Sequence, residues 1–201
     1  MLLHALIPAS RANGPGLRAV GFFQGCKIGC VGCWNPNSHH FHGAEFTVDA
    51  VAQEVLGAWQ EHALEGITFS GGEPMQQADS LLRLIQCLHQ QVPHLSFGMF
   101  SGYAEHELDY GQYWVWGDGI PEPRRKRLWQ DIRGCLDFAI LGRFKQAQPS
   151  NMPLRTSRNQ VLRLFTNRYT LADFSEQLTE ISIKEGGRVE VTGFPILGLP
   201  W

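Results

Sequence analysis

Residues 18–34 read RAVGFFQGCKIGCVGCW, an apolar stretch that leads directly into a loop rich in cysteine and glycine. Residues 18–24 have the apolar and aromatic side chains expected of a strand. Three thiols follow at Cys26, Cys30 and Cys33, separated by three and then two residues. The glycines of the loop are Gly25, Gly29 and Gly32. Because glycine lets the backbone fold closely around a bulky group, this segment predicts a metal or cluster site at the end of a strand.

Downstream of this loop, strand-like and helix-like patterns alternate. Thr47 is a predicted helix cap, and the apolar residues after it recur at spacings of three and four on one helix face. They are Val48, Val51, Val55 and Trp59. The other predicted elements are a helix at about 78–90, buried strands at 66–70, 95–100 and 136–141, and an edge strand at 2–9. Strands alternating with helices predict an α/β fold with a parallel sheet, open or partly closed.

The composition is typical of one globular domain, which we expect to span residues 1–201. The chain is 43% hydrophobic and 18% charged, with a formal charge of −2 at pH 7. No apolar run approaches the roughly 18 residues of a membrane span. Residues 1–7 are apolar but end at Pro8 without a preceding basic residue, so we expect a cytoplasmic protein. The balanced charge provides no broad field for nucleic acid or an anionic membrane.

Residues 105–131 interrupt the alternation and are predicted to be an insertion. The basic run RRKR at 124–127 follows two prolines and is interpreted as the solvent-exposed surface of a helix rather than as a nucleic-acid site. The tryptophans of this segment either pack it onto the body or form a lid or docking surface. They are Trp114, Trp116 and Trp129. The residues after 165 are predicted to be a C-terminal extension, in which the pattern of 188–194 indicates a terminal strand.

The remaining cysteines, Cys87 and Cys135, stand apart in apolar surroundings and are predicted to be small core residues. For the clustered trio, thiolate chemistry allows two metals. A four-iron cluster would use the three thiolates and leave one iron open, whereas a structural zinc ion would add a histidine as its fourth ligand. The candidate histidines are His39, His40 and His42, which otherwise form a polar surface loop.

Two motifs resemble the signature of radical S-adenosylmethionine (SAM) enzymes. Residues 26–34, CKIGCVGCW, resemble the CxxxCxxC motif whose cysteines carry a 4Fe-4S cluster and are followed by an aromatic residue, here Trp34. Residues 69–74, FSGGEP, are similar to the glycine-rich turn after the second strand of that family. Both motifs in this order are much more specific than either alone. The resemblance implies a truncated, partial TIM-like β/α barrel with its ligands at the carboxyl ends of the strands.

Further blocks are similar to the activases of glycyl radical enzymes, most of all to those of anaerobic (class III) ribonucleotide reductase. They are NGPGLR (13–18), FFQGC (22–26), WNP (34–36), GITFSGGEP (66–74), SGY (101–103), GRF (142–144) and SRNQ (157–160). The resemblance implies a radical SAM oxidoreductase that cleaves SAM reductively and generates a glycyl radical on a partner enzyme. It also implies an electron donor such as flavodoxin or ferredoxin. The balanced charge, by contrast, is what leads us to expect no membrane partner and disfavours nucleic acid.

The resemblance also assigns site residues. The implied cluster ligands are Cys26, Cys30 and Cys33. The implied SAM contacts are Gly32, Cys33 and Trp34 on the adenosyl side and Gly71, Gly72 and Glu73 at the methionine amino group, where the carboxylate balances an ammonium charge. Asn159 and Gln160 are candidates for hydrogen bonds to SAM or to the incoming peptide, or else for a polar cap on the following strand.

The chain departs from the family pattern at Leu141, where an acidic residue often precedes the glycine of GRF. It also departs in the GSSNQ-like block of the family, which reads TSRNQ here at 156–160. Two other functions stay open: a radical SAM enzyme acting on a small molecule or a modified peptide, and a zinc-binding interaction module. Residues 188–194, RVEVTGF, faintly resemble a glycyl radical loop, but their alternation favours a strand, so we do not expect self-activation.

Overall fold

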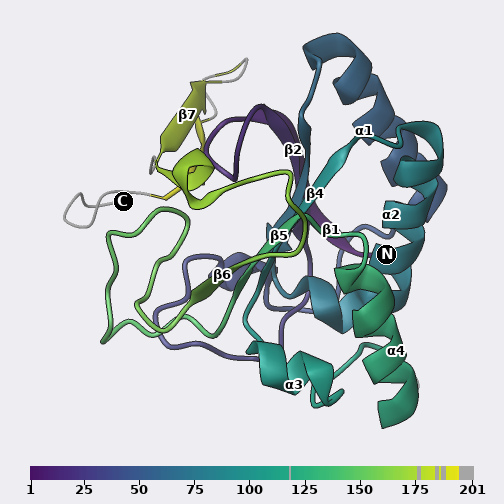
Figure 1. Cartoon of the computed structure of the whole chain (residues 1–201), viewed down its shortest axis with the longest axis vertical. Coiled ribbons are helices and arrows are strands. Elements are labelled where there is room, and N and C mark those ends of the chain that lie inside the picture. Colours follow the sequence, from purple (N-terminus) through teal and green to yellow (C-terminus); the bar gives the residue numbers. More distant parts are fainter. Residues whose placement is uncertain (118, 176–177, 184–185, 187–188, 195–201) are drawn as a thin grey trace.

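The computed structural model describes residues 1–117, 119–175, 178–183, 186 and 189–194. Its centre is a six-stranded sheet in the order β1-β2-β3-β4-β5-β6 (Figure 1). The strands are β1 (Leu3–Ser10), β2 (Arg18–Phe23), β3 (Gly66–Gly71), β4 (Ser96–Ser101), β5 (Phe138–Leu141) and β6 (Val161–Leu164). Strands β2 to β5 are parallel, whereas β1 and β6 pair antiparallel at the two edges. The predicted α/β class, with a mostly parallel sheet and the first strand at an edge, is confirmed.

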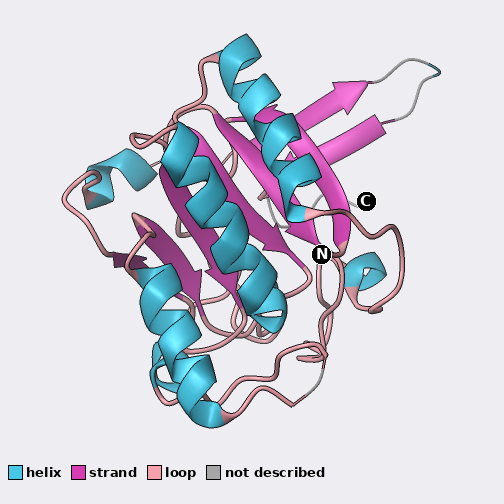
Figure 2. Ribbon diagram, turned by 90° about the vertical axis from the view of Figure 1, so that its right-hand side faces the viewer, coloured by secondary structure: helices cyan, strands magenta, loops and turns pink. Residues whose placement is uncertain are grey.

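Three helices connect the parallel strands and cover one face of the sheet (Figure 2). They are α1 (Val48–His62), α2 (Ala78–Gln91) and α4 (Glu122–Arg133), and α2 packs against both of the others. The predicted cap of α1 is confirmed, because Thr47 Oγ1 accepts a hydrogen bond from Ala50 N at 3.1 Å. Val51 and Val55 are buried, as the predicted apolar face requires. None of the helices in the described chain is long and apolar enough to span a membrane.

Residues 105–131 lie within the connection between β4 and β5. This connection contains α3 (Glu105–Asp109) and α4, which buries Leu128, Trp129 and Ile132. The indole Nε1 of Trp129 donates a hydrogen bond to Asp109 Oδ1 at 2.8 Å. This tryptophan therefore packs the segment onto the body, and α4 is the crossover helix of the last parallel pair. The extent of an insertion relative to other proteins stays a prediction.

The basic run at 124–127 is engaged within its own chain, as expected of a helix surface. The ion pairs join Arg124 to Asp79, Lys126 to Glu122 and Arg127 to Asp131. Arg125 donates hydrogen bonds to the carbonyl oxygens of Gly111 and Ile120. Elsewhere, Cys87 and Cys135 are half-buried and pack against the main core, in agreement with their prediction as small core residues.

A separate antiparallel hairpin lies beside the main sheet, at the upper left of Figure 1. It consists of β7 (Thr179–Ile183) and β8 (Val189–Gly193), and β8 confirms the predicted terminal strand. The hairpin is fastened to the turn after β1, because Asn13 Nδ2 donates to Thr192 Oγ1 at 3.0 Å. The amide of Arg11 also donates to Glu180 Oε1 at 2.8 Å. Two segments far apart in sequence therefore meet here.

A second small core lies on the sheet face opposite the helices. Phe138 and Ile140 of β5 point to this side, where they pack with Phe174 and Phe194. Their neighbours in the strand, including Leu141, point to the helical side and belong to the main core. Both faces of β5 are therefore buried, which explains its unbroken apolar sequence.

Arg18, the first residue of β2, is fully buried. Its guanidinium donates to Thr68 Oγ1 at 2.8 Å, Ser96 O at 3.1 Å and Tyr169 Oη at 3.2 Å, and it lies 5.1 Å from the centre of the Phe138 ring. Within the described residues no carboxylate is within ion-pair distance of it. Burial lowers its pKa below the ordinary value. The guanidinium therefore donates its hydrogen bonds to neutral oxygen atoms. Arg18 of β2 is bonded in this way to Thr68 of β3 and Ser96 of β4.

Candidate functional site

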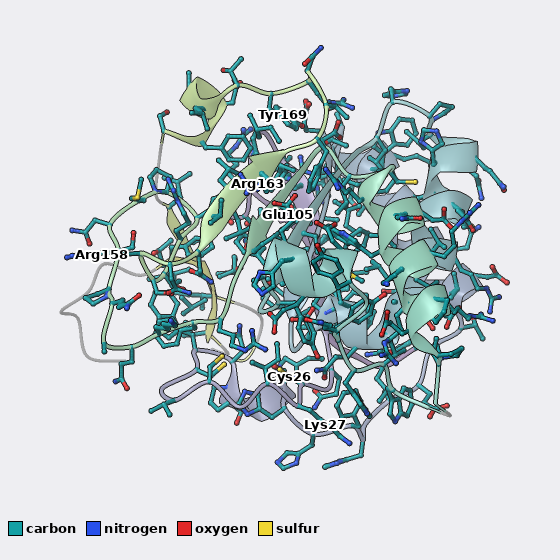
Figure 3. All side chains as sticks on the ribbon, turned by 60° about the horizontal axis from the view of Figure 1, so that its bottom comes forward. Cys26, Lys27, Glu105, Arg158, Arg163 and Tyr169 are labelled. Carbon is teal, nitrogen blue, oxygen red and sulfur yellow. The ribbon has the colours of Figure 1, made fainter. Side chains whose placement is uncertain are left out.

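A cavity of about 610 Å³ lies at the carboxyl ends of the parallel strands. Several predicted site residues line it: the three clustered cysteines, Trp34, Gly71, Gly72, Glu73 and Gln160. Gly32 and Asn159 are not among the lining residues. Figure 3 labels Cys26 and its neighbour Lys27 at this end of the molecule. Ligands of parallel α/β proteins commonly bind at this edge, because the loops after the strands converge there.

Two of the three clustered sulfurs accept hydrogen bonds from amides of their own loop. Ile28 N donates to Cys26 Sγ at 3.5 Å, and Asn35 N donates to Cys33 Sγ at 3.4 Å. Amides placed in this way stabilise a metal-bound thiolate. Burial raises the pKa of Cys26 to about 12 and also raises the pKa of Cys30. Both thiols are therefore protonated at neutral pH in the protein alone, and a bound metal would displace their protons.

The FSGGEP turn lies directly against the backbone of the cysteine loop. Glu73 N donates to Gly25 O at 2.9 Å, and Gly72 N donates to Phe23 O at 2.8 Å. A Cβ at position 72 would lie 2.4 Å from Gly25 O, closer than two such atoms can approach. Gly71 has a φ of 94°, which other residues rarely adopt. The two motifs therefore form one structural unit that requires glycine at both positions.

Gly32 and Trp34 contribute to the loop in different ways. Gly32 has a φ of 71°, and a Cβ there would lie 2.6 Å from Gln146 Oε1. Its requirement for glycine comes from the backbone of the loop, and a contact of Gly32 with SAM stays a prediction. Trp34 lines the cavity, with its ring centre 6.0 Å from that of Phe144. The tryptophan thus presents an aromatic surface where the adenosyl group is expected.

Glu73 joins the ends of β3 and β4. Its carboxylate is 1% exposed and accepts hydrogen bonds from Met75 N at 2.9 Å, Ser101 Oγ at 2.9 Å and Gly102 N at 2.7 Å. Burial raises the pKa of Glu73 to about 7, although the three hydrogen bonds act in the opposite direction. Ser101, the first residue of the SGY block, is therefore brought to the turn. A role of Glu73 in balancing a ligand ammonium stays a prediction.

Gln76 is a buried polar residue that the sequence analysis missed. Its Oε1 accepts a hydrogen bond from Lys27 N at 2.8 Å, and its Nε2 donates to Tyr103 Oη at 2.8 Å. Its carbonyl oxygen accepts from Trp116 N at 2.7 Å. This residue therefore connects the cysteine loop, the end of β4 and the tryptophan-containing segment. The one sequence signal for it is its place two residues after the FSGGEP turn.

Asn159 and Gln160 hold the loop after β5 in place. Gln160 Oε1 accepts hydrogen bonds from Thr156 N and Oγ1 at 2.8 and 2.9 Å, and its Nε2 donates to Gly142 O at 3.1 Å. Asn159 Nδ2 donates to Arg143 O at 2.8 Å. These bonds fit the structural alternative, a polar cap beside β6. Contact of either side chain with SAM or a peptide stays a prediction.

Leu141, which stands where the family often has an acidic residue, is a buried core residue. Leu141 is 2% exposed in the core at the end of β5, so position 141 itself provides no charge at this edge. Two residues later, Arg143 forms a two-pronged ion pair with Glu107, with Nη2 and Oε1 2.8 Å apart. This hydrogen-bonded guanidinium lowers the pKa of Glu107 below its usual value. The sequence analysis missed this pair, because its members lie 36 residues apart.

Residues 12–163 match the family described as the 4Fe-4S single cluster domain. The chain belongs to this family. The matched segment of this 4Fe-4S single cluster domain contains the cysteine loop, the FSGGEP turn and all four parallel strands. The family thus accounts for the part of the chain that forms most of the cavity.

Curated relatives of the 4Fe-4S domain are activating proteins. An anaerobic ribonucleoside-triphosphate reductase-activating protein of Vibrio cholerae is 26% identical over 171 residues, 83% of this chain and 99% of the relative. The protein of that name from Escherichia coli K12 is 28% identical over 119 residues, 57% of this chain and 77% of the relative. A pyruvate formate-lyase-activating enzyme of Clostridium pasteurianum is 31% identical over 114 residues, 55% of this chain and 45% of the relative.

Membership of the 4Fe-4S family answers the question of iron or zinc. Across the described residues, no three side chains of His, Cys, Asp or Glu converge to hold a single metal ion. None of His39, His40 and His42 lines the cavity that the clustered cysteines share. The arrangement therefore does not support a zinc site completed by one of these histidines. That the cysteines are the cluster ligands stays a prediction from their motif.

Gly72→Ala is expected to separate the two motifs of the 4Fe-4S domain. The new methyl group would lie 2.4 Å from Gly25 O, so the backbone must shift. We expect a loss of stability of about 1–3 kcal/mol in urea unfolding, as in other overpacked sites. We also expect reduced iron and sulfide content after reconstitution.

The matched control is Gly57→Ala in α1, where a Cβ meets open space. It should gain up to about 1 kcal/mol. Full cluster retention in Gly72→Ala would contradict the argument.

The pKa of Glu73 predicts a pH-dependent contribution to the stability of the cluster-free protein. The folded-state pKa of about 7 lies above the ordinary value of 4.5, so folding favours the protonated carboxyl. This contribution is complete below pH 4.5 and is lost as the pH rises through 7. Its size is on the order of 3 kcal/mol. We expect the free energy of unfolding in urea to fall less between pH 5 and pH 8 in Glu73→Gln than in wild type. Equal slopes would show that burial does not raise this pKa.

Proposed function

We propose that this protein is a radical SAM activase, which generates a glycyl radical on a partner enzyme, and that the partner is an anaerobic ribonucleotide reductase. The observation that carries the proposal is one cavity shared by the three cysteines and the FSGGEP turn, at the carboxyl ends of parallel strands. The names of the Vibrio cholerae and Escherichia coli relatives support this choice of partner. The match covers 99% of the Vibrio cholerae protein.

The residues present fit both cofactors. Cys26, Cys30 and Cys33 provide soft thiolate ligands for a 4Fe-4S cluster, and the cavity of about 610 Å³ is within the usual range of ligand pockets. SAM would bind between Trp34 and the Gly71-Gly72 turn, where the backbone is free of side chains. When bound, the cofactors supply the one-electron cleavage of SAM to methionine and a 5′-deoxyadenosyl radical.

The task of the protein chain is to orient the reactants and exclude water. The hydrogen bonds of Glu73 to Ser101 and Gly102 hold the glycine turn against β4. Phe22, Phe100 and Phe144 line the cavity with apolar rings. Such an apolar lining excludes water from the reacting groups. The same cavity would hold the glycine Cα of a partner polypeptide beside the bound SAM, where the cofactors would supply the hydrogen-atom transfer.

Two finer features belong to the proposal. The sheet would be the wall of a truncated, partial TIM-like barrel, because its strand order follows the chain and its crossover helices cover one face. The electron would come from a donor such as flavodoxin or ferredoxin, and the protein would work in the cytoplasm, as the sequence leads us to expect.

The test is anaerobic reconstitution with iron and sulfide, followed by addition of SAM, a reductant and anaerobic ribonucleotide reductase. We expect the EPR doublet of a glycyl radical on the reductase and one 5′-deoxyadenosine for each radical formed. Pyruvate formate-lyase, assayed in parallel, tests the partner named by the Clostridium pasteurianum relative. SAM cleavage without a radical on either enzyme would favour the alternative, a radical SAM enzyme acting on a small molecule or peptide.

A further inference from the structure

The segment after β5 carries positive charge that the described structure does not neutralise. Between Asp137 and Asp173 the sequence has six basic residues and no acidic one. Three of them form ion pairs: Arg143 with Glu107, Arg163 with Glu105, and Arg168 with Glu65. The other three, Lys145, Arg155 and Arg158, form no ion pair with any described residue. We call these three residues the cationic rim.

The cationic rim borders the cavity. Phe144 and Leu154 line the cavity, and each is directly followed in the chain by a rim cation. Lys145 and Arg158 are exposed. Figure 3 shows the Arg158 side chain directed away from the body of the molecule. The loop at 143–160 therefore has apolar side chains at the cavity and unpaired charges beside its mouth.

The conformation of this loop is strained and incompletely satisfied. Leu154 is buried with a φ of 59°, in the left-handed region. A residue with a side chain adopts this conformation only at an energetic cost. Two buried polar atoms, Arg155 Nε and Asn159 Oδ1, have no hydrogen-bond partner in the described structure. Strain and unpaired polar groups commonly concentrate at sites that a binding partner completes.

We propose that the cationic rim is a docking surface for carboxylates that flank the reactive glycine of the partner enzyme. The proposal rests on the proposed function, because a polypeptide that delivers a glycine to the cavity must cross its mouth. Val191 and Thr192 of β8 line the same cavity, so the segment would lie between the hairpin and the rim. The three cations have no acidic neighbours in the sequence between 137 and 173, so their charge is complementary to that of an acidic segment of the partner. Such complementarity raises the rate of encounter and fixes the register of binding.

The test is the double variant Lys145→Glu/Arg158→Glu in the full chain, with anaerobic ribonucleotide reductase as the probe. We expect the Kd for the reductase at low salt to rise by about tenfold or more, and its dependence on salt between 50 and 200 mM to become weaker. SAM cleavage without the reductase should be unchanged, because neither side chain lines the cavity. Unchanged SAM cleavage also shows that the variant is folded.

The matched control is Arg83→Glu/Arg127→Glu, which makes the same change in net charge at exposed positions of α2 and α4. Its Kd for the reductase should stay within about twofold of wild type. The proposal is overturned if the rim variant binds as wild type does, if the control loses as much affinity, or if wild type does not bind the reductase. Loss of binding to a single-stranded DNA 20-mer, with reductase binding intact, would reassign the rim to nucleic acid. Failure of the proposed function would look different: salt-dependent binding of the reductase without a glycyl radical.

Discussion

Cys33→Ala is expected to abolish the formation of 5′-deoxyadenosine by the reconstituted protein. Removal of one of three predicted ligands leaves a second iron without protein support, and Cys33 also lines the cavity where SAM is expected. Loss of a residue that only supports a ligand already costs about 10–100-fold, so we expect a decrease of at least about a hundredfold. The measurements are 5′-deoxyadenosine by chromatography and bound iron and sulfide by chemical analysis.

The matched control for this variant is Cys87→Ala. Cys87 is half-buried against the main core, is not among the cavity residues, and should retain wild-type iron and SAM cleavage. Substantial SAM cleavage by Cys33→Ala, with a normal cluster, would show that this cysteine is not a ligand. Equal loss in both cysteine variants would point to a general effect of losing a thiol.

Arg18→Met is expected to have the largest effect on stability among the residues described. Methionine fills part of the same volume but leaves the oxygens of Thr68, Ser96 and Tyr169 without the guanidinium donors they now have. Each unsatisfied buried group costs about 1–3 kcal/mol, so we expect a total loss of about 3–5 kcal/mol. For a chain of this size, this corresponds to a decrease in Tm of roughly 10 °C.

Calorimetry or urea unfolding of the cluster-free protein measures this effect, with Arg83→Met on the surface of α2 as the control. Arg83 is exposed, and its substitution should change stability by less than about 0.5 kcal/mol. A similar small change in Arg18→Met would mean that removal of the buried charge offsets the lost hydrogen bonds. Such a result occurs where a hydrophobic side chain replaces a buried ionic group well.

The sequence predicted those parts of the fold that depend on local patterns. The apolar face after Thr47 and the alternation at 188–194 were sufficient, because periodicity reports which side of an element is buried. The sequence also singled out the cysteine loop and the FSGGEP turn, whose roles in binding stay predictions. Both motifs depend on neighbouring residues, and both lie at the cavity.

What could not be predicted depends on contacts between distant residues. A basic residue at the start of a strand gives no sign that it will be buried, so the hydrogen bonds of Arg18 were invisible in the sequence. The same holds for Gln76, whose three partners lie in separate segments. The RRKR run indicated the exposed surface of a helix, but not that this helix is the crossover between β4 and β5, since only Leu128, Trp129 and Ile132 of α4 are buried.

Asn13 and Thr192, which are hydrogen-bonded to each other, both line the cavity, so the cavity is complete only after both ends of this sequence range have been synthesised. The cysteine loop ends by residue 34, but the cavity also includes Val191, Thr192 and Gly193 of β8. A ribosome needs about 10–30 s to add the roughly 160 residues between them at typical rates. During that interval the three thiols leave the ribosome before their enclosure exists. Cluster assembly and oxidation would therefore compete for an open loop in the nascent chain until β8, the last strand that the structure describes, has folded at the cavity.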